Sequence, residues 1–117
     1  MKVENINSLQ PNFNAKVSPR FIKSMQGYFN NGENRLKNNY RLNQKIEEYA
    51  SFGKDDYTIE MRQKIGPLGY EYSLVAVRDG DESGKGVVLA IRTAYKKIVN
   101  KFMNMNKREF RSHFKRR

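Results

Sequence analysis

The chain has 117 residues, 38% of them hydrophobic and 12% aromatic, with one histidine, no cysteine and a formal net charge of +11. This length suits a single domain, and the absence of cysteine excludes disulfide bonds, thiolate metal ligands and a cysteine nucleophile. The sequence shows neither a run of about 18 apolar residues nor a secretory signal, so we expect a cytoplasmic protein without a membrane span.

Residues 1–17 predict an extended N-terminal arm, because their apolar positions follow no helical period. The alternation from Phe13 to Val17 leaves two possibilities open: a short added strand, or a segment that pins the arm to the core. A single α+β domain is expected over residues 18–106. Residues 107–117 are expected to be a basic C-terminal helix extension or tail.

Two helices are predicted at the start of this domain. Ser18 followed by Pro19 is a helix-start signal, because serine caps free amides and proline is tolerated at the first helical position. A break follows at residues 30–32. Apolar residues at helical spacing then predict a second helix that ends near Phe52 and Gly53.

Three strands follow the helices. From Tyr57 the apolar period changes to two, as a half-buried strand requires. The turn Gly66-Pro67-Leu68-Gly69 leads into a second strand that runs to Arg78, and a polar loop over residues 79–86 leads into a third strand over residues 87–91. We expect these strands to form an antiparallel meander.

A last helix is predicted from about Arg92 or Thr93, with an apolar stripe that includes Ile98, Phe102 and Met105. The expected fold is therefore α+β, with two N-terminal helices, a three-stranded antiparallel β-meander and a long basic C-terminal helix packed on the sheet. The element order is α-α-β-β-β-α.

Positive charge is concentrated at the C-terminus. Residues 92–117 hold ten of the 23 Lys and Arg residues and a single acid, Glu109, while the rest of the chain is nearly balanced. Clustered bases gain free energy by releasing the counterions condensed on a polyanion. The ten bases are therefore the candidate nucleic-acid-binding residues: Arg92, Lys96, Lys97, Lys101, Lys107, Arg108, Arg111, Lys115, Arg116 and Arg117.

On one continuous helix, at about 100° per residue, several of these bases share the face opposite the apolar stripe. That face would present a cationic ridge to phosphates, whereas a solvated helix face is the alternative reading. Phe110 and Phe114 lie among the bases and can stack on nucleobases, enter a membrane interface or pack against the arm. We expect packing.

From about Arg35 onward, the predicted helix, three-strand meander and closing helix, with Gly66-Pro67 between the first two strands, resemble a double-stranded-RNA-binding domain. In that family the loop after the first strand contacts a minor groove, and lysines at the start of the last helix contact phosphates. The resemblance implies these roles for Gly66 and Pro67 and for Lys96 and Lys97. The family's loop histidine is absent here, and bulky residues follow Lys97 where the family packs alanines.

Tyr70 and Tyr72 point to the same strand face, either into the core or outward as a stacking platform, and we expect the core. The 79–86 loop has the wrong spacing for a phosphate-binding loop, and its acids lack the rest of a calcium loop. His113 has only Glu109 within helical reach and no orienting partner. We therefore expect no catalytic residues, no metal site and no cofactor.

The sequence predicts a small non-enzymatic nucleic-acid-binding protein that contacts mainly the phosphate backbone, with RNA ahead of DNA. The alternative is a protein-interaction module of a bacterial or phage accessory protein, whose basic face docks an acidic protein partner. The sequence leaves the oligomeric state and any sequence preference open.

Overall fold

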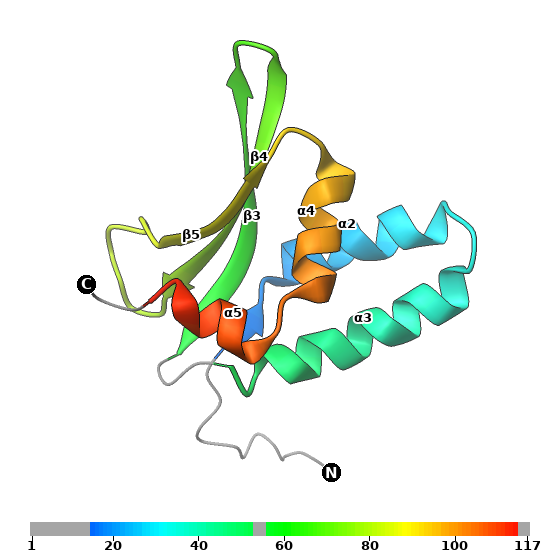
Figure 1. Ribbon diagram of the computed structural model, residues 1–117, viewed down its shortest axis with the longest axis horizontal. Coiled ribbons are helices and arrows are strands. Elements are labelled where there is room, and N and C mark those ends of the chain that lie inside the picture. Colours follow the sequence, from blue (N-terminus) through cyan, green and yellow to red (C-terminus); the bar gives the residue numbers. More distant parts are fainter. Residues whose placement is uncertain (1–14, 53–55, 115–117) are drawn as a thin grey trace.

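The computed structural model describes residues 15–52 and 56–114. In chain order these ranges contain β2 (Ala15–Val17), α2 (Pro19–Asn30), α3 (Arg35–Tyr49), β3 (Tyr57–Gly66), β4 (Gly69–Arg78), β5 (Val87–Arg92), α4 (Tyr95–Asn104) and α5 (Lys107–Ser112). The helices gather on one side of a twisted sheet, and the β3–β4 hairpin projects well beyond them (Figure 1). Residues 1–14 of the arm expected over residues 1–17 lie outside the described residues.

The sheet differs from the predicted three-stranded antiparallel meander. Its order is β2-β3-β4-β5, and β2 pairs with β3 in parallel, Ala15 opposite Tyr57 and Val17 opposite Ile59. The element order over the described residues is therefore β-α-α-β-β-β-α-α, and the sheet is mixed. A parallel neighbour needs a long crossover connection, and α2 with α3 provides it.

The short strand β2 pairs with β3 and leads directly into α2. Ala15 and Val17 are buried and Lys16 between them is exposed, which is the alternation of a half-buried strand. The Ser18 amide donates to the Ile59 carbonyl at 2.8 Å, and the Ser18 hydroxyl accepts from the Phe21 amide, as predicted for the N-cap of α2. The arm alternation thus forms a strand at residues 15–17.

The prediction of one long C-terminal helix is also wrong. Met105 has an extended backbone, with φ −74° and ψ 134°, and α4 ends at Asn104. Asn106 then begins α5, because its side-chain oxygen accepts from the Glu109 amide at 2.8 Å. The change of direction carries Phe110 into the core, where it is fully buried.

An aromatic cluster joins these helices. The Tyr49 ring of α3 stacks on Phe102 of α4 with centroids 4.5 Å apart, and it meets Phe110 of α5 edge-on. The Tyr49 hydroxyl donates to the Phe102 carbonyl at 2.8 Å. Because α4 ends two residues later, that carbonyl has no partner within its own helix, and Tyr49 satisfies it. Phe110 therefore packs in the core, as expected from the sequence.

Candidate functional site

Three of the predicted bases lie close together in the chain where β5 leads into α4, and we call them the basic start of α4: Arg92, Lys96 and Lys97. Arg92 ends β5, and both lysines are exposed in the first turn of the helix. That turn holds no acidic residue, and its N-cap, Ala94, makes no side-chain capping bond. The positive end of the helix dipole and three cations thus share one surface.

The other bases do not join this group. Lys101 forms an ion pair with Glu109 that ties α4 to α5. The Arg111 guanidinium donates to the Phe52 carbonyl at 2.6 Å, next to the C-terminal end of α3. Lys107 and Arg108 are exposed on α5, whereas Lys115, Arg116 and Arg117 lie outside the described residues. The change of direction at Met105 and Asn106 separates the bases that a continuous helix would align.

A row of tyrosines adjoins the basic start of α4: Tyr70, Tyr72, Tyr95 and Tyr28. Adjacent rings in this order have centroids 6.5, 5.8 and 5.4 Å apart. Tyr72 lies directly opposite Arg92 in the β4–β5 ladder. The row therefore passes one of the clustered cations at Tyr72 and extends across β4, α4 and α2.

The tyrosine row is partly open to solvent. Tyr70 is 54% exposed, so the expectation of a core position is wrong for it, whereas Tyr72 is half-buried against the core. The physical reason is that Tyr70 pairs with Ile65 next to the turn of the β3–β4 hairpin, and this end of the hairpin projects past the helices (Figure 1). Burial raises the pKa of the Tyr95 hydroxyl, and that hydroxyl shares a 2.6 Å hydrogen bond with Ser24. The row is thus fixed at Tyr95 and exposed at its two ends, Tyr70 and Tyr28.

Sequence reasoning missed Tyr28 and Tyr95 as members of this surface. Tyr28 is 37% exposed on α2, 67 residues before Tyr95 in the chain. Their contact depends on the packing of α2 against α4, which no local pattern encodes. The available signal was compositional: the chain has seven tyrosines and no tryptophan, and an excess of tyrosine among bases is typical of surfaces that stack on nucleobases.

Two carboxylates of the acidic loop between β4 and β5, those of Asp79 and Asp81, form hydrogen bonds or ion pairs with nearby residues. Asp79 pairs with Lys16 and accepts from the Thr58 hydroxyl at 2.8 Å, and Asp81 accepts from the Ser83 amide and hydroxyl. Within residues 15–52 and 56–114, no group of three or more His, Cys, Asp or Glu side chains is arranged to hold a metal ion. The contacts of Asp79 and Asp81 within the fold therefore account for these two acidic residues of the loop.

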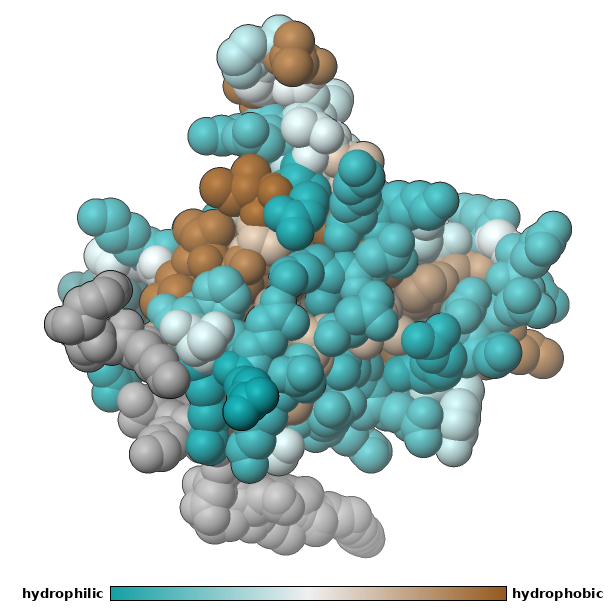
Figure 2. Space-filling view, in the orientation of Figure 1, coloured by the Kyte–Doolittle hydropathy of each residue, from teal (hydrophilic) through white to brown (hydrophobic). Residues whose placement is uncertain are grey.

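Apolar side chains also reach the surface away from the tyrosines. Figure 2 shows hydrophobic residues gathered over β5 and at the tip of the β3–β4 hairpin, against a largely hydrophilic face. On β5 the exposed apolar residues are Val88 and Ile91, about half exposed, and at the tip Leu68 is 96% exposed. Among the described helices, none is long and apolar enough to cross a lipid bilayer.

Comparison with known protein families, with curated proteins and with solved structures finds no match for this chain.

Proposed function

We propose that this is a non-enzymatic nucleic-acid-binding protein whose basic start of α4 contacts phosphates beside the tyrosine row. One observation carries the proposal: three cations share the positive end of a helix, next to exposed aromatic rings. Lysines in the first turn of a helix oppose its dipole, at a cost of roughly 0.3–1 kcal/mol each. A bound polyanion relieves that repulsion, whereas helix stability does not explain it.

The aromatic rings favour a ligand with accessible bases. Proteins that bind single-stranded nucleic acid usually combine cations along the phosphate backbone with aromatic side chains on which bases stack. The preference for RNA over DNA rests on the resemblance of the region from about Arg35 onward to the double-stranded-RNA-binding domain. RNA also offers unpaired bases in loops and ends.

The test compares two double variants in fluorescence-anisotropy binding to labelled single-stranded RNA, duplex RNA and duplex DNA. The Lys96→Gln/Lys97→Gln variant removes two phosphate contacts, so the slope of log affinity against log salt should fall in magnitude by about 1.5. The control is Arg35→Gln/Lys37→Gln, which removes the same charge from the exposed first turn of α3. Its slope should change little.

The outcomes separate the possibilities. An equal fall in the salt slope of the two variants would mean that net charge, and not the basic start of α4, determines binding. No binding to any of the three nucleic acids near physiological salt would overturn the proposal.

A protein-docking role is the second candidate. The observation that favours it is the apolar surface on β5, an edge strand of the sheet, where Val88 and Ile91 are exposed. An acidic protein partner docked on β5 would also form ion pairs with the C-terminal Lys and Arg residues. A partner recovered with the protein after nuclease treatment, and lost from a Val88→Lys/Ile91→Lys variant, would support this role.

A further inference from the structure

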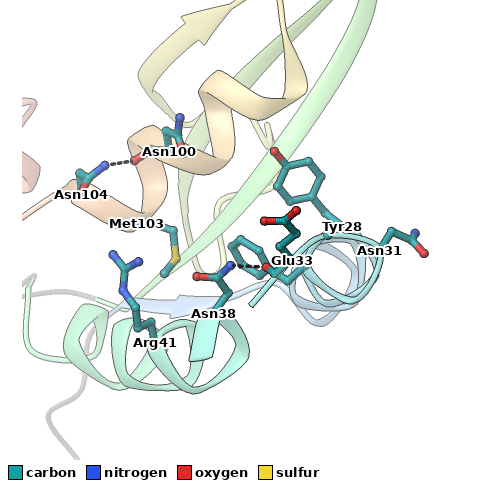
Figure 3. A pocket seen from close by; sticks show the side chains of 10 residues that line it. Tyr28, Asn31, Glu33, Asn38, Arg41, Asn100, Met103 and Asn104 are labelled. Atoms are coloured by element: carbon teal, nitrogen blue, oxygen red, sulfur yellow. Dashed lines mark hydrogen bonds between the residues drawn. The ribbon is translucent and has the colours of Figure 1, made fainter. Parts of the chain in front are cut away.

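A cleft of about 510 Å³ lies between the C-terminal end of α2, the start of α3 and the second half of α4. This volume is within the range of roughly 300–1,000 Å³ that small-molecule sites occupy. Figure 3 shows Arg41 of α3 and Met103 of α4 pointing toward each other across it, with Tyr28 and Glu33 at the other end. The side-chain amide of Asn38 donates to the backbone carbonyl of Glu33 at 3.3 Å and so holds the α2–α3 connection against α3.

The lining combines three kinds of group. Phe29 and Met103 are half-buried and, with Tyr28, offer apolar surface. The Arg41 guanidinium and the Glu33 carboxylate are exposed, and neither makes a hydrogen bond or ion pair with another residue in the described part of the chain. The cleft therefore presents a free cation, a free anion and flat apolar surface together.

A nucleotide matches this set of groups. Its ring faces pack on aromatic and apolar side chains, its amino groups donate to carboxylates, and its phosphate pairs with arginine. An isolated anion would be repelled by Glu33, and an isolated cation by Arg41. Paired bases in a duplex cannot expose a ring face, so the matching ligand is an unpaired nucleotide.

The cleft adjoins the tyrosine row, which lies beside the proposed phosphate site. Tyr28 belongs to both surfaces, because its ring contacts Tyr95 at 5.4 Å and Phe29 at 5.5 Å. On α4, Lys96 lies four residues before Asn100, a cleft residue on the same helical face. The distance along the helix is about 6 Å, so a strand bound at Lys96 reaches the cleft within one or two nucleotides.

We propose that the cleft takes one unpaired base of a bound RNA strand, with the ring against Tyr28 and Phe29, Glu33 accepting from the base and Arg41 bound to a phosphate. This inference rests on the proposed function. It adds a base-dependent contribution, concentrated at one position, to the phosphate contacts of the basic start of α4 and to stacking on the tyrosine row.

The test uses a labelled single-stranded RNA of about twelve nucleotides and the same backbone with abasic residues throughout. The wild-type protein should bind the RNA with bases about tenfold tighter than the abasic strand. In Tyr28→Ala this ratio should fall severalfold, while affinity for the abasic strand is retained. The matched control is Tyr40→Ala, which removes an exposed tyrosine of α3 that is not in the cleft.

Two more variants test the polar roles. Arg41→Gln should weaken binding of the RNA more than Arg20→Gln, which removes another exposed arginine, at the start of α2. Glu33→Gln should change the order of affinity among homopolymeric RNAs, because an amide both donates and accepts. Thermal melting checks that each variant is folded.

The results distinguish the two proposals. Equal, salt-dependent affinity of the wild type for both strands would overturn the base site and the stacking on the tyrosine row, and would leave the phosphate contacts of the proposed function intact. A base-dependent ratio unchanged in Tyr28→Ala would place the stacking elsewhere and also overturn the base site. No binding of either strand would overturn both proposals.

Discussion

Gly86 connects the 79–86 loop to β5 in a conformation that favours glycine. Its φ is +73°, and a Cβ atom there would lie 2.6 Å from Val75 Cγ1 and 2.9 Å from the Ala76 carbonyl. Gly84 has a similar φ of +65°, but a Cβ atom at that position would meet nothing within 4 Å. Substitution of Gly84 therefore introduces backbone strain alone, whereas substitution of Gly86 adds steric overlap to it.

We expect Gly84→Ala to lower the free energy of unfolding by about 1 kcal/mol, the usual cost of a left-handed alanine. Gly86→Ala should lower it by about 3 kcal/mol, because overpacking against Val75 is added to the same strain. Urea unfolding of both variants at neutral pH measures the difference. Equal losses would show that β5 can move away from β4 without cost.

Tyr49 joins three helices through its ring and its hydroxyl. Burial raises the pKa of the Tyr49 hydroxyl, and the carboxylates of Glu109 and Glu48 raise it further, so the group remains a donor at physiological pH. Tyr49→Phe keeps the stacked ring but leaves the buried Phe102 carbonyl without its partner. The free energy of unfolding should fall by about 1.5 kcal/mol, measured by urea denaturation.

Tyr40→Phe is the control for this change. The Tyr40 hydroxyl accepts from Gln44 at 3.3 Å on the exposed side of α3, and the side chain is 64% exposed. Its removal should cost less than about 0.5 kcal/mol. A similar cost for the two tyrosines would mean that water replaces the Tyr49 hydroxyl at the Phe102 carbonyl.

Among the elements, β2 is the smallest, and its surface contact is sensitive to pH. Lys16 of β2 donates to Asp79 after β4, and this hydrogen bond lowers the pKa of the Asp79 carboxyl; burial opposes the effect, and the Thr58 hydroxyl adds to it. A lowered folded-state pKa stabilises the protein fully above the unfolded value of about 3.9. That contribution is lost as the pH falls through the lowered value.

Asp79→Asn should therefore cost up to about 1 kcal/mol of unfolding free energy at neutral pH, since the pair is largely exposed. The difference from the wild type should shrink between about pH 5 and pH 2. Glu82→Gln, in the same loop, is the control, because Glu82 is exposed and makes no ion pair with another residue in the described ranges. A difference that stays constant with pH would exclude the charge of Asp79 as its cause.

The helices α4 and α5 show why an amphipathic pattern does not fix the length of an element. The apolar stripe through Ile98, Phe102 and Met105 is real, and all three residues are fully buried. The same stripe would extend past Asn106 only if the helix axis continued. Asn106 caps a new helix and Phe110 packs against Tyr49, so burial of one aromatic ring outweighs the continuity of the helix.

In the whole molecule, the fold divides the C-terminal bases by role. Lys101 and Arg111 hold helices together, Lys107 and Arg108 lie exposed on α5, and the basic start of α4 faces the tyrosine row. Packing of α2 against α4 brings Tyr28 to that row and at the same time forms one wall of the cleft. Phosphate contact and base contact are therefore proposed for adjoining surfaces of one side of the molecule.

The sequence alone determined the features that depend on near neighbours. Ser18-Pro19 marked the start of α2, alternation marked β3 and β4, and the turn at Gly66–Gly69 closed their hairpin, because caps, pleats and turns are set within a few residues. The uneven charge was also evident from composition.

Only the tertiary structure decided the parallel pairing of β2 with β3, the end of α4 at Asn104, the exposure of Tyr70 and the meeting of Tyr28 with Tyr95. Each depends on residues that are distant in the chain or on how far one element extends past another. A local apolar period shows that a side chain will be covered, but the packing of the whole chain determines what covers it.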